Sequence, residues 1–394
     1  MPSSKSVRRA SASAEKKGSA MRKVFRDDHQ IFRDQVRRFI DREIVPYHAE
    51  WEHQGYVPKS VWLKAGQEGL LCVMAPEAFG GAGGDYGHSA VLIEELARAN
   101  ATAVGFTTHS EIVANYIVAY GNAEQKQRWL PKMISGEMIS VIAMTEPGIG
   151  SDLRSMRTTV RRDGDAYVIN GSKTFITNGF NSGMAVVACK TDPNEKNLTL
   201  VCVEEGTPGF TKGKRLEKIG LKGQDTSELF FDDVRVPVAN RLGEEGKGFH
   251  YLTHQLAWER LIIAIRAAAS IEALLEETIE YTRARKAFAQ TVFDFQNTRF
   301  SLAAAKAEAT MLRAFVDECL GEVMEGTLTG EKAAMAKLVG SELQGKLLDQ
   351  FLQLHGGYGF MSEYEVSRAW VDARVARIYG GTSEIMKEII ARSL

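Results

Sequence analysis

The sequence contains few cysteines and no paired cysteine motif. Only four occur in 394 residues, namely Cys72, Cys189, Cys202 and Cys319, and no C-x-x-C pair is present. This spacing argues against a metal or dithiol redox site. Scattered cysteines of this kind predict buried thiols in a reducing compartment.

Long apolar runs and an excess of charge of one sign are also missing. No apolar stretch approaches the roughly 20 residues that a membrane-spanning helix needs. The formal net charge is -1, so no global field favours nucleic acid or an anionic membrane surface as a partner. Hydrophobic residues at 44% and charged residues at 25% are ordinary for a soluble globular protein, and the length allows two or three domains.

The first twenty residues differ in composition from the rest. They are rich in Ser, Ala, Lys and Arg, with Glu15 as their one acid. The segment is similar in composition to a transit peptide, but it is short and has no clear amphipathic face. We expect residues 1–20 to be a disordered tail, or an upstream extension if Met21 is the true start. The expected location is cytoplasmic, or the mitochondrial matrix if the tail is a transit peptide.

The spacing of apolar residues predicts three domains. Residues 21–138 have helical spacing, as in Phe32, Val36, Phe39 and Ile40, and again in Leu92, Ile93 and Leu96. The loop Gly80–Gly84 between these stretches does not match G-x-G-x-x-G, which excludes a Rossmann dinucleotide site. We therefore predict an N-terminal helical domain.

Residues 139–241 change to a period of two and predict a small antiparallel β domain. Asn170-Gly171-Ser172 predicts a hairpin turn between the strands Asp165–Asn170 and Lys173–Thr177, because Asn-Gly tolerates positive φ. Further strands are predicted at Ala185–Lys190, Leu198–Val203 and Leu229–Val234.

Residues 242–394 return to helical spacing, in long segments that are poor in proline. The predicted helices are His250–Tyr281, Thr298–Glu325, Gly330–Leu354 and Met386–Arg392. The order of helices, strands and helices indicates an α+β chain that is mainly helical.

Five motifs in this order carry a family resemblance. Ile142–Asp152 reads Ile-Ala-Met-Thr-Glu-Pro-Gly-Ile-Gly-Ser-Asp, and Phe175-Ile176-Thr177 follows it. A loop rich in Thr, Gly and Ser beside a polar-tipped strand can present N–H groups and hydroxyls to a flat polar ring. With Arg285–Phe288, Gln353–Gly357 and Tyr379–Glu384, these motifs resemble the acyl-CoA dehydrogenases, especially their long-chain subgroup. The resemblance covers nearly everything after residue 21.

The resemblance implies an N-terminal helical domain, a middle antiparallel β domain and a C-terminal four-helix bundle that bind FAD. Met144 and Thr145 would lie near the flavin ring, and Thr177 would donate toward N5. Phe175 would lie against the ring, where many relatives carry Trp. The implied FAD contacts are Ile142, Ala143, Met144, Thr145, Ser151, Phe175, Ile176, Thr177, Arg285, Phe288, Gln296, Gln353, Leu354, His355, Gly356, Gly357, Thr382, Ser383 and Glu384.

Part of this set also has a purely structural explanation. Arg285 would hold the FAD pyrophosphate by resemblance, since its planar fork suits phosphate oxygens. Its cationic neighbours would also be favoured at any helix C-terminus. Gln296 and Gln353–Gly357 would contact the adenine end of FAD across a subunit boundary, although Gly356 and Gly357 could simply end a helix.

The residue that removes the substrate proton departs from the commonest family pattern. Many relatives carry this base as Glu in Tyr-Glu-Gly-Thr, whereas this chain reads Tyr379-Gly380-Gly381-Thr382. Either the chain is inactive or another carboxylate replaces it. Glu259 lies on a predicted helix with no cation three or four residues away (Gln255, Leu256, Ile262, Ile263), so its charged form should be disfavoured and its proton affinity raised. The long-chain and isovaleryl subgroups place their base here, and we predict Glu259 over the alternative of a solvent-exposed glutamate.

Gly380 would keep a main-chain role in the implied reaction. Its N–H and a ribityl hydroxyl would bind the enolate oxygen, and Gly380 and Gly381 would leave space beside the substrate Cα. His250 and His254 have i, i+4 spacing, but no third ligand is apparent, so no metal is expected. Ile149, where relatives usually have Ala, would either narrow the thioester end or point away. The implied substrate contacts are Ser151, His250, Leu256, Arg260, Gly380 and Gly381.

These residues predict the α,β-dehydrogenation of a fatty acyl-CoA to trans-2-enoyl-CoA in fatty acid β-oxidation, with a long chain favoured. Glu259 would take the α proton, flavin N5 the hydride, and an electron-transfer flavoprotein the electrons. The resemblance also implies a homotetramer. Three alternatives stay open: an acyl-CoA oxidase using dioxygen, a dehydrogenase for branched or terpenoid acyl-CoA, and an inactive acyl-CoA-binding or scaffold protein.

Overall fold

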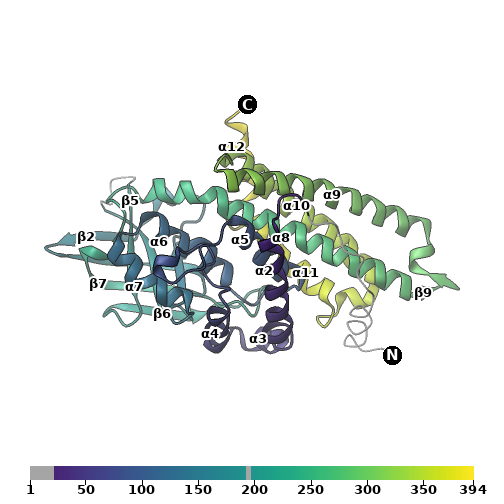
Figure 1. Cartoon of the computed structure of the whole chain (residues 1–394), viewed down its shortest axis with the longest axis horizontal. Helices are drawn as coiled ribbons and strands as arrows, with labels where there is room; N and C mark the ends of the chain where they lie inside the picture. The colour runs from purple at the N-terminus through teal and green to yellow at the C-terminus, as the bar shows by residue number, and fades with distance from the viewer. Residues whose placement is uncertain (1–21, 192–196) are drawn as a thin grey trace.

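The computed structural model describes residues 22–191 and 197–394, and the predicted tail at residues 1–20 lies outside this part. Figure 1 shows a β-sheet at one end of the molecule and long C-terminal helices at the other. The N-terminal helices lie against both. The predicted order of helices, strands and helices is confirmed.

The N-terminal helices bury the predicted apolar stripes. Val36 and Phe39 are buried on α2 and Ile40 follows them, while Leu92 and Ile93 are buried on α5. These helices are α2 (Asp27–Phe39), α3 (His48–Gln54), α4 (Lys59–Gln67), α5 (Tyr86–Arg98), α6 (Ala114–Tyr120) and α7 (Ala123–Ile134), with π-helical turns η1 (Ile40–Ile44) and η3 (Thr108–Val113).

The middle segment forms an eight-stranded sheet in the order β6-β7-β3-β2-β4-β5-β8, with β1 paired to β4. Most pairs are antiparallel, as predicted, but β4 is parallel to both β1 and β2. The strands are β1 (Ser140–Ala143), β2 (Thr159–Asp163), β3 (Ala166–Thr177), β4 (Met184–Lys190), β5 (Leu198–Glu204), β6 (Phe210–Arg215), β7 (Thr226–Pro237) and β8 (Arg241–Leu242).

The hairpin predicted at Asn170-Gly171 is wrong. Strand β3 runs through this dipeptide, and the turn that joins β2 to β3 lies at Gly164, where φ is +66°. Gly171 instead marks a register shift against β7, and a Cβ there would lie 2.5 Å from Thr158 Oγ1. Glycine is needed at this position because another chain segment approaches closely, not because the chain reverses.

The C-terminal half contains every helix that was predicted, with ends shifted by a few residues, and one that was not, α11. Helix α10 packs against α8, α9, α11 and α12. The helices are α8 (Gly248–Ala284), α9 (Gln296–Glu325), α10 (Gly330–His355), α11 (Glu365–Ala373) and α12 (Ser383–Ala391), with the short strands β9 (Lys286–Ala287) and β10 (Gln290–Thr291) at the end of α8.

Two apolar cores hold these parts together. One core joins the N-terminal helices, the C-terminal helices and the facing side of the sheet, and the other covers the opposite side. All seven residues of β4 are buried because both of its faces are covered. The four cysteines are free and buried, as predicted. Within the described residues, no helix combines the length and the apolar character needed to cross a bilayer.

Candidate active site

Glu259 lies on α8, the 37-residue helix that connects the sheet end of the molecule to the far end of the bundle. Its side chain is buried, so the alternative of a solvent-exposed glutamate is wrong. The hydroxyl of Tyr116, on α6, donates a hydrogen bond to Glu259 Oε1 over 2.9 Å. Tyr116 is itself fully buried. The carboxyl group is therefore held in one orientation between an N-terminal and a C-terminal helix.

Burial raises the pKa of Glu259 from its ordinary value of 4.5 to about 7. The hydrogen bond from Tyr116 and the charge of Arg260 oppose this shift, because both favour the carboxylate. The raised proton affinity expected from the apolar helical neighbours is thus present. A carboxyl group with a pKa near neutrality can both accept and release a proton at physiological pH.

The loop that carries Gly380 and Gly381 packs against the same face of α8. Both glycines have left-handed backbones, with φ of +63° and +94°. A Cβ on Gly380 would lie 2.5 Å from Ile263 Cδ1, and Ile263 lies one helical turn after Glu259. Tertiary structure therefore brings Gly380 and Glu259 together. The space that a side chain would need at Gly380 is already occupied by Ile263.

The predicted flavin loop begins at the end of β1 and is tied to β3. The Thr174 N–H donates to the carbonyl of Thr145 over 2.9 Å. The buried ammonium of Lys173 donates to the carbonyl of Met144 over 3.1 Å and to Glu146 Oε1 over 2.9 Å. These bonds hold the loop 144–149 beside the strand that carries Phe175 and Thr177, as the motif pair predicted.

Phe175 lies in an irregular part of β3. The register against β7 shifts between Lys173 and Ile176, and Phe175 between them has a φ of +59°. The residue is 68% exposed. A left-handed backbone costs free energy in a non-glycine residue and tends to occur where a ligand is bound. An exposed ring on such a backbone, next to a rigid polar loop, fits a flat aromatic cofactor.

The residues after Gly381 begin helix α12. Thr382 is the N-cap, and its side chain accepts a hydrogen bond from the Ile385 N–H over 3.3 Å. Ser383 is buried, and its hydroxyl has no partner among the described residues. Glu384 is exposed, and hydrogen bonds at the helix start lower its pKa. This helix start leaves polar groups available to a ligand.

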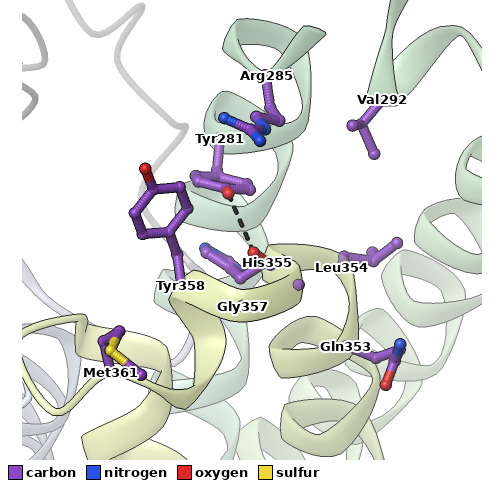
Figure 2. A pocket seen from close by; sticks show the side chains of 10 residues that line it. Tyr281, Arg285, Val292, Gln353, Leu354, His355, Gly357, Tyr358 and Met361 are labelled. Atoms are coloured by element: carbon purple, nitrogen blue, oxygen red, sulfur yellow. Dashed lines mark hydrogen bonds between the residues drawn. The ribbon is translucent and has the colours of Figure 1, made fainter. Parts of the chain in front are cut away.

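A second group of predicted cofactor residues gathers at the opposite end of α8. Figure 2 shows Arg285 and Tyr281 above Gln353–Gly357, around a pocket of about 450 Å³. The Tyr281 hydroxyl donates to the carbonyl of His355 over 3.0 Å, and their rings stack at 4.2 Å. The Arg285 guanidinium lies 5.6 Å from the ring of Tyr358. A guanidinium beside stacked rings suits a phosphate and an aromatic base.

This pocket lies far from Glu259 within one chain. The 26 residues of α8 and its end that separate Glu259 from Arg285 span about 39 Å, at roughly 1.5 Å per residue. Figure 1 shows the two ends of α8 on opposite sides of the molecule. The predicted cofactor residues therefore form two separate groups.

The remaining predicted residues have varied surroundings. Phe288 is 93% exposed and has a φ of +51°, and Gln296 starts α9 as an exposed residue. Neither lines the pocket at Arg285. Ile142 is half-buried on β1, beside the buried Ala143.

The predicted substrate residues also differ in burial. Ser151 and His250 are exposed, Leu256 is half-buried and Arg260 is buried.

One group of side chains has the geometry of metal ligands, at a place the sequence did not indicate. Ligand atoms of Asp28, His29 and His88 lie within 4.8 Å of one another. However, the guanidinium of Arg26 already pairs with Asp28 and Asp85, and His29 Nε2 lies 2.8 Å from Asp85 Oδ1. This network caps the starts of α2 and α5.

Two residues that contact the candidate site, Tyr116 and Lys337, were not predicted from the sequence. Tyr116 belongs to a mostly apolar helix and resembles an ordinary aromatic residue of the core. Lys337 is the one basic residue in the apolar run Ala333–Leu338 on α10, and it donates to the carbonyl of Gly381 over 2.6 Å. A lone lysine in a run of alanines was a signal that could have identified it.

The fold and these two residue groups define a three-part flavoenzyme architecture, and comparison with known proteins identifies it. The family descriptions "Acyl-CoA dehydrogenase, N-terminal domain", "middle domain" and "C-terminal domain" match residues 26–137, 141–234 and 246–394. The chain belongs to the acyl-CoA dehydrogenase family and is an oxidoreductase of that family. The resemblance inferred from the five motifs is confirmed.

Individual relatives agree with this assignment. Long-chain specific acyl-CoA dehydrogenases from the mitochondria of Sus scrofa and Rattus norvegicus are each 48% identical over 95% of this chain and 88% of their own length. The crystal structure of acyl-CoA dehydrogenase from Geobacillus kaustophilus has a TM-score of 0.92 and 47% identity, and covers 94% of this chain and 98% of its own. The family is FAD-dependent, which confirms the predicted cofactor.

Proposed function

We propose that this chain removes two hydrogens from the α and β carbons of a long-chain fatty acyl-CoA and produces trans-2-enoyl-CoA. The observation that carries this proposal is the buried carboxyl of Glu259, whose pKa is raised to about 7, beside the Gly380 loop. The preference for long chains is supported by the names of the relatives that are 48% identical.

Glu259 removes the proton from the substrate Cα. The carboxylate is favoured at pH values above about 7, and Tyr116 keeps it oriented in the deprotonated and protonated states. The main-chain N–H of Gly380 binds the thioester oxygen and stabilises the negative charge that develops there. Burial excludes water, which strengthens both interactions and limits side reactions.

The loop 144–149 and the end of β3 would hold the flavin of FAD in this proposal. Met144, Thr145 and Thr177 would contact its polar edge, and Phe175 would pack against its ring. When bound, FAD supplies the hydride acceptor for the hydrogen on Cβ. The rigid anchoring of the loop through Lys173 and Glu146 orients the donors before the cofactor binds.

The test of this function compares wild type with Glu259→Gln. Purified wild type should lose its flavin absorbance when mixed anaerobically with acyl-CoA thioesters, fastest with long straight chains. Glu259→Gln should hold FAD normally and lose absorbance at least about a hundredfold more slowly, since the general base is gone. Near-wild-type rates in this variant would remove Glu259 from the mechanism. Peroxide formation without an added acceptor would assign the chain to the oxidases.

We further propose that each FAD is shared between two chains of a homotetramer. The distance of about 39 Å between Glu259 and Arg285 along α8 supports this arrangement. The flavin end then contacts one chain and the adenine end contacts the Arg285 pocket of a second chain. This division explains why the two groups of cofactor residues lie at opposite ends of one helix.

Complementation between defective chains tests the shared site. Glu259→Gln and Arg285→Ala should each have little activity as homogeneous assemblies. Unfolding and reassembling the two together should restore sites that combine an intact Glu259 with an intact Arg285 from different chains. If both residues of a site come from the same chain, no activity returns. Light scattering on the wild type reports whether the assembly contains four chains.

The electron acceptor of this chain is proposed to be an electron-transfer flavoprotein. Support comes from the family and from a structural relative at 30% identity and a TM-score of 0.90, titled "Electron transferring flavoprotein of Acidaminococcus fermentans". Turnover should then require an added flavoprotein acceptor and proceed slowly with dioxygen alone.

A further inference from the structure

A lysine is buried directly beneath the loop that carries Gly380. Lys337 lies on α10 with its side chain fully buried, and its Nζ donates to the carbonyl oxygen of Gly381 over 2.6 Å. Among the described residues, no carboxylate lies within ion-pair distance of this ammonium group. Because burial disfavours a charged ammonium, a lysine at this position requires an explanation beyond packing.

The loop above Lys337 is held on both sides. Arg266 on α8 donates to the hydroxyl of Tyr379 over 3.2 Å, and Thr382 caps α12. Between these anchors, Gly380 and Gly381 have left-handed backbones that offer little resistance to rotation. Lys337 bonds to the main chain at Gly381, so its hydrogen bond holds the carbonyl of the peptide group that follows the two glycines.

The charge of Lys337 also lies close to the place where negative charge develops. In the proposed reaction, the Gly380 N–H faces the thioester oxygen, one residue from the carbonyl that Lys337 binds. Burial and the charge of Arg260 lower the pKa of Lys337 to about 8, while Glu384 and Glu342 act in the opposite direction. The ammonium form therefore predominates at neutral pH. In a water-poor site its positive field reaches the thioester oxygen with little screening.

We propose that Lys337 is a positioning residue that orients the Gly380–Gly381 loop and electrostatically favours formation of the substrate enolate. In that step, the Cα–H bond breaks and the proton moves to the Glu259 carboxylate. The electron pair forms the Cα–C1 double bond, and the thioester oxygen becomes negatively charged. No electron leaves the substrate in this step. The inference rests on the function proposed above and extends it to a residue outside the substrate's direct contacts.

Hydrogen exchange at Cα isolates this step from turnover. The probe is a long-chain 3-thia-acyl-CoA, in which a sulfur replaces the β carbon so that no hydride can leave. Holoenzyme in D₂O should exchange the α hydrogens, and mass spectrometry measures the rate. Lys337→Met keeps the length of the side chain and removes the charge, and it should exchange at least about tenfold more slowly at unchanged affinity for the probe. Lys337→Arg should recover part of the rate.

A matched control lies on the same helix. Lys346 is exposed and pairs with Glu308, so Lys346→Met should exchange at the wild-type rate. Melting temperature and FAD content, measured for every variant, identify loss of folding. The proposal for Lys337 is overturned if folded Lys337→Met exchanges as fast as wild type, or if Lys337→Arg is no faster than Lys337→Met. If wild type does not exchange, or Glu259→Gln exchanges normally, the proposed function fails instead.

Discussion

Replacing Glu259 by glutamine should make the protein more stable at pH 8 while abolishing its proposed chemistry. The folded-state pKa of Glu259 is about 7 and its ordinary value is 4.5. Below pH 4.5 the carboxyl group is neutral in the folded and unfolded states. As pH rises from 4.5 through 7, the unfolded chain ionises first, so the protein loses stability over this window and no further above it.

The size of this effect follows from the shift in pKa. A difference of about 2.5 pKa units corresponds to about 3 kcal/mol in the free energy of unfolding at pH 8. Glutamine has nearly the same shape and no charge, and its amide oxygen can still accept the hydrogen bond that Tyr116 donates. Glu259→Gln should therefore recover most of this free energy at pH 8 and almost none at pH 4.5.

Thermal unfolding at several pH values measures the effect. The melting temperature of Glu259→Gln should exceed that of wild type by on the order of 5 °C at pH 8, and the difference should vanish near pH 4.5. Glu280→Gln, at an exposed position on the same helix, serves as the control, because it makes the same substitution without removing a buried carboxyl group. A difference for Glu259→Gln that is constant with pH, or a less stable variant at pH 8, refutes the reasoning from burial.

Three further single variants and one double variant test other contacts of the candidate site. Tyr116→Phe removes a hydrogen bond that favours the carboxylate, so the pKa of Glu259 should rise, and the acid limb of kcat/KM against pH should move to higher pH by about one unit. Gly380→Ala places a Cβ against Ile263 on a left-handed backbone; it should lower activity and cost about 1–2 kcal/mol of stability. Adding Ile263→Ala should restore part of the activity lost in Gly380→Ala, whereas an unchanged double variant contradicts the proposed collision. Phe175→Gly should raise the melting temperature of the apoprotein by relieving the left-handed backbone, yet weaken FAD binding in a titration.

Most secondary-structure elements could be predicted from local pattern. Helices α8, α9 and α10 are long and rich in Ala and Leu. Their apolar residues repeat at helical spacing over many turns, so the pattern predicts a helix clearly. The Asn170-Gly171 prediction failed because a dipeptide reports only which φ values are tolerated. Whether the chain then turns or bulges depended on Thr158, which approaches Gly171 from another segment.

The candidate site was only partly predictable. Glu259 could be proposed because its own helix supplies apolar neighbours, although its raised pKa comes from burial in the folded structure. Tyr116 and Lys337 could not, because their relevant partners, Glu259 and the carbonyl of Gly381, are distant in sequence. A hydrogen bond between distant residues has no local periodicity and leaves no pattern in either segment.

The amino-acid pattern therefore specified the order of helices and strands, the family and the candidate for the proton acceptor, since each depends on spacing or on contiguous motifs. Tertiary packing decided the surroundings of that candidate. It buried Glu259 against Tyr116, brought Gly380 against Ile263, and placed Arg285 about 39 Å along α8 from Glu259. These features arise from which surfaces of separate elements meet, and burial at such contacts controls both pKa and geometry.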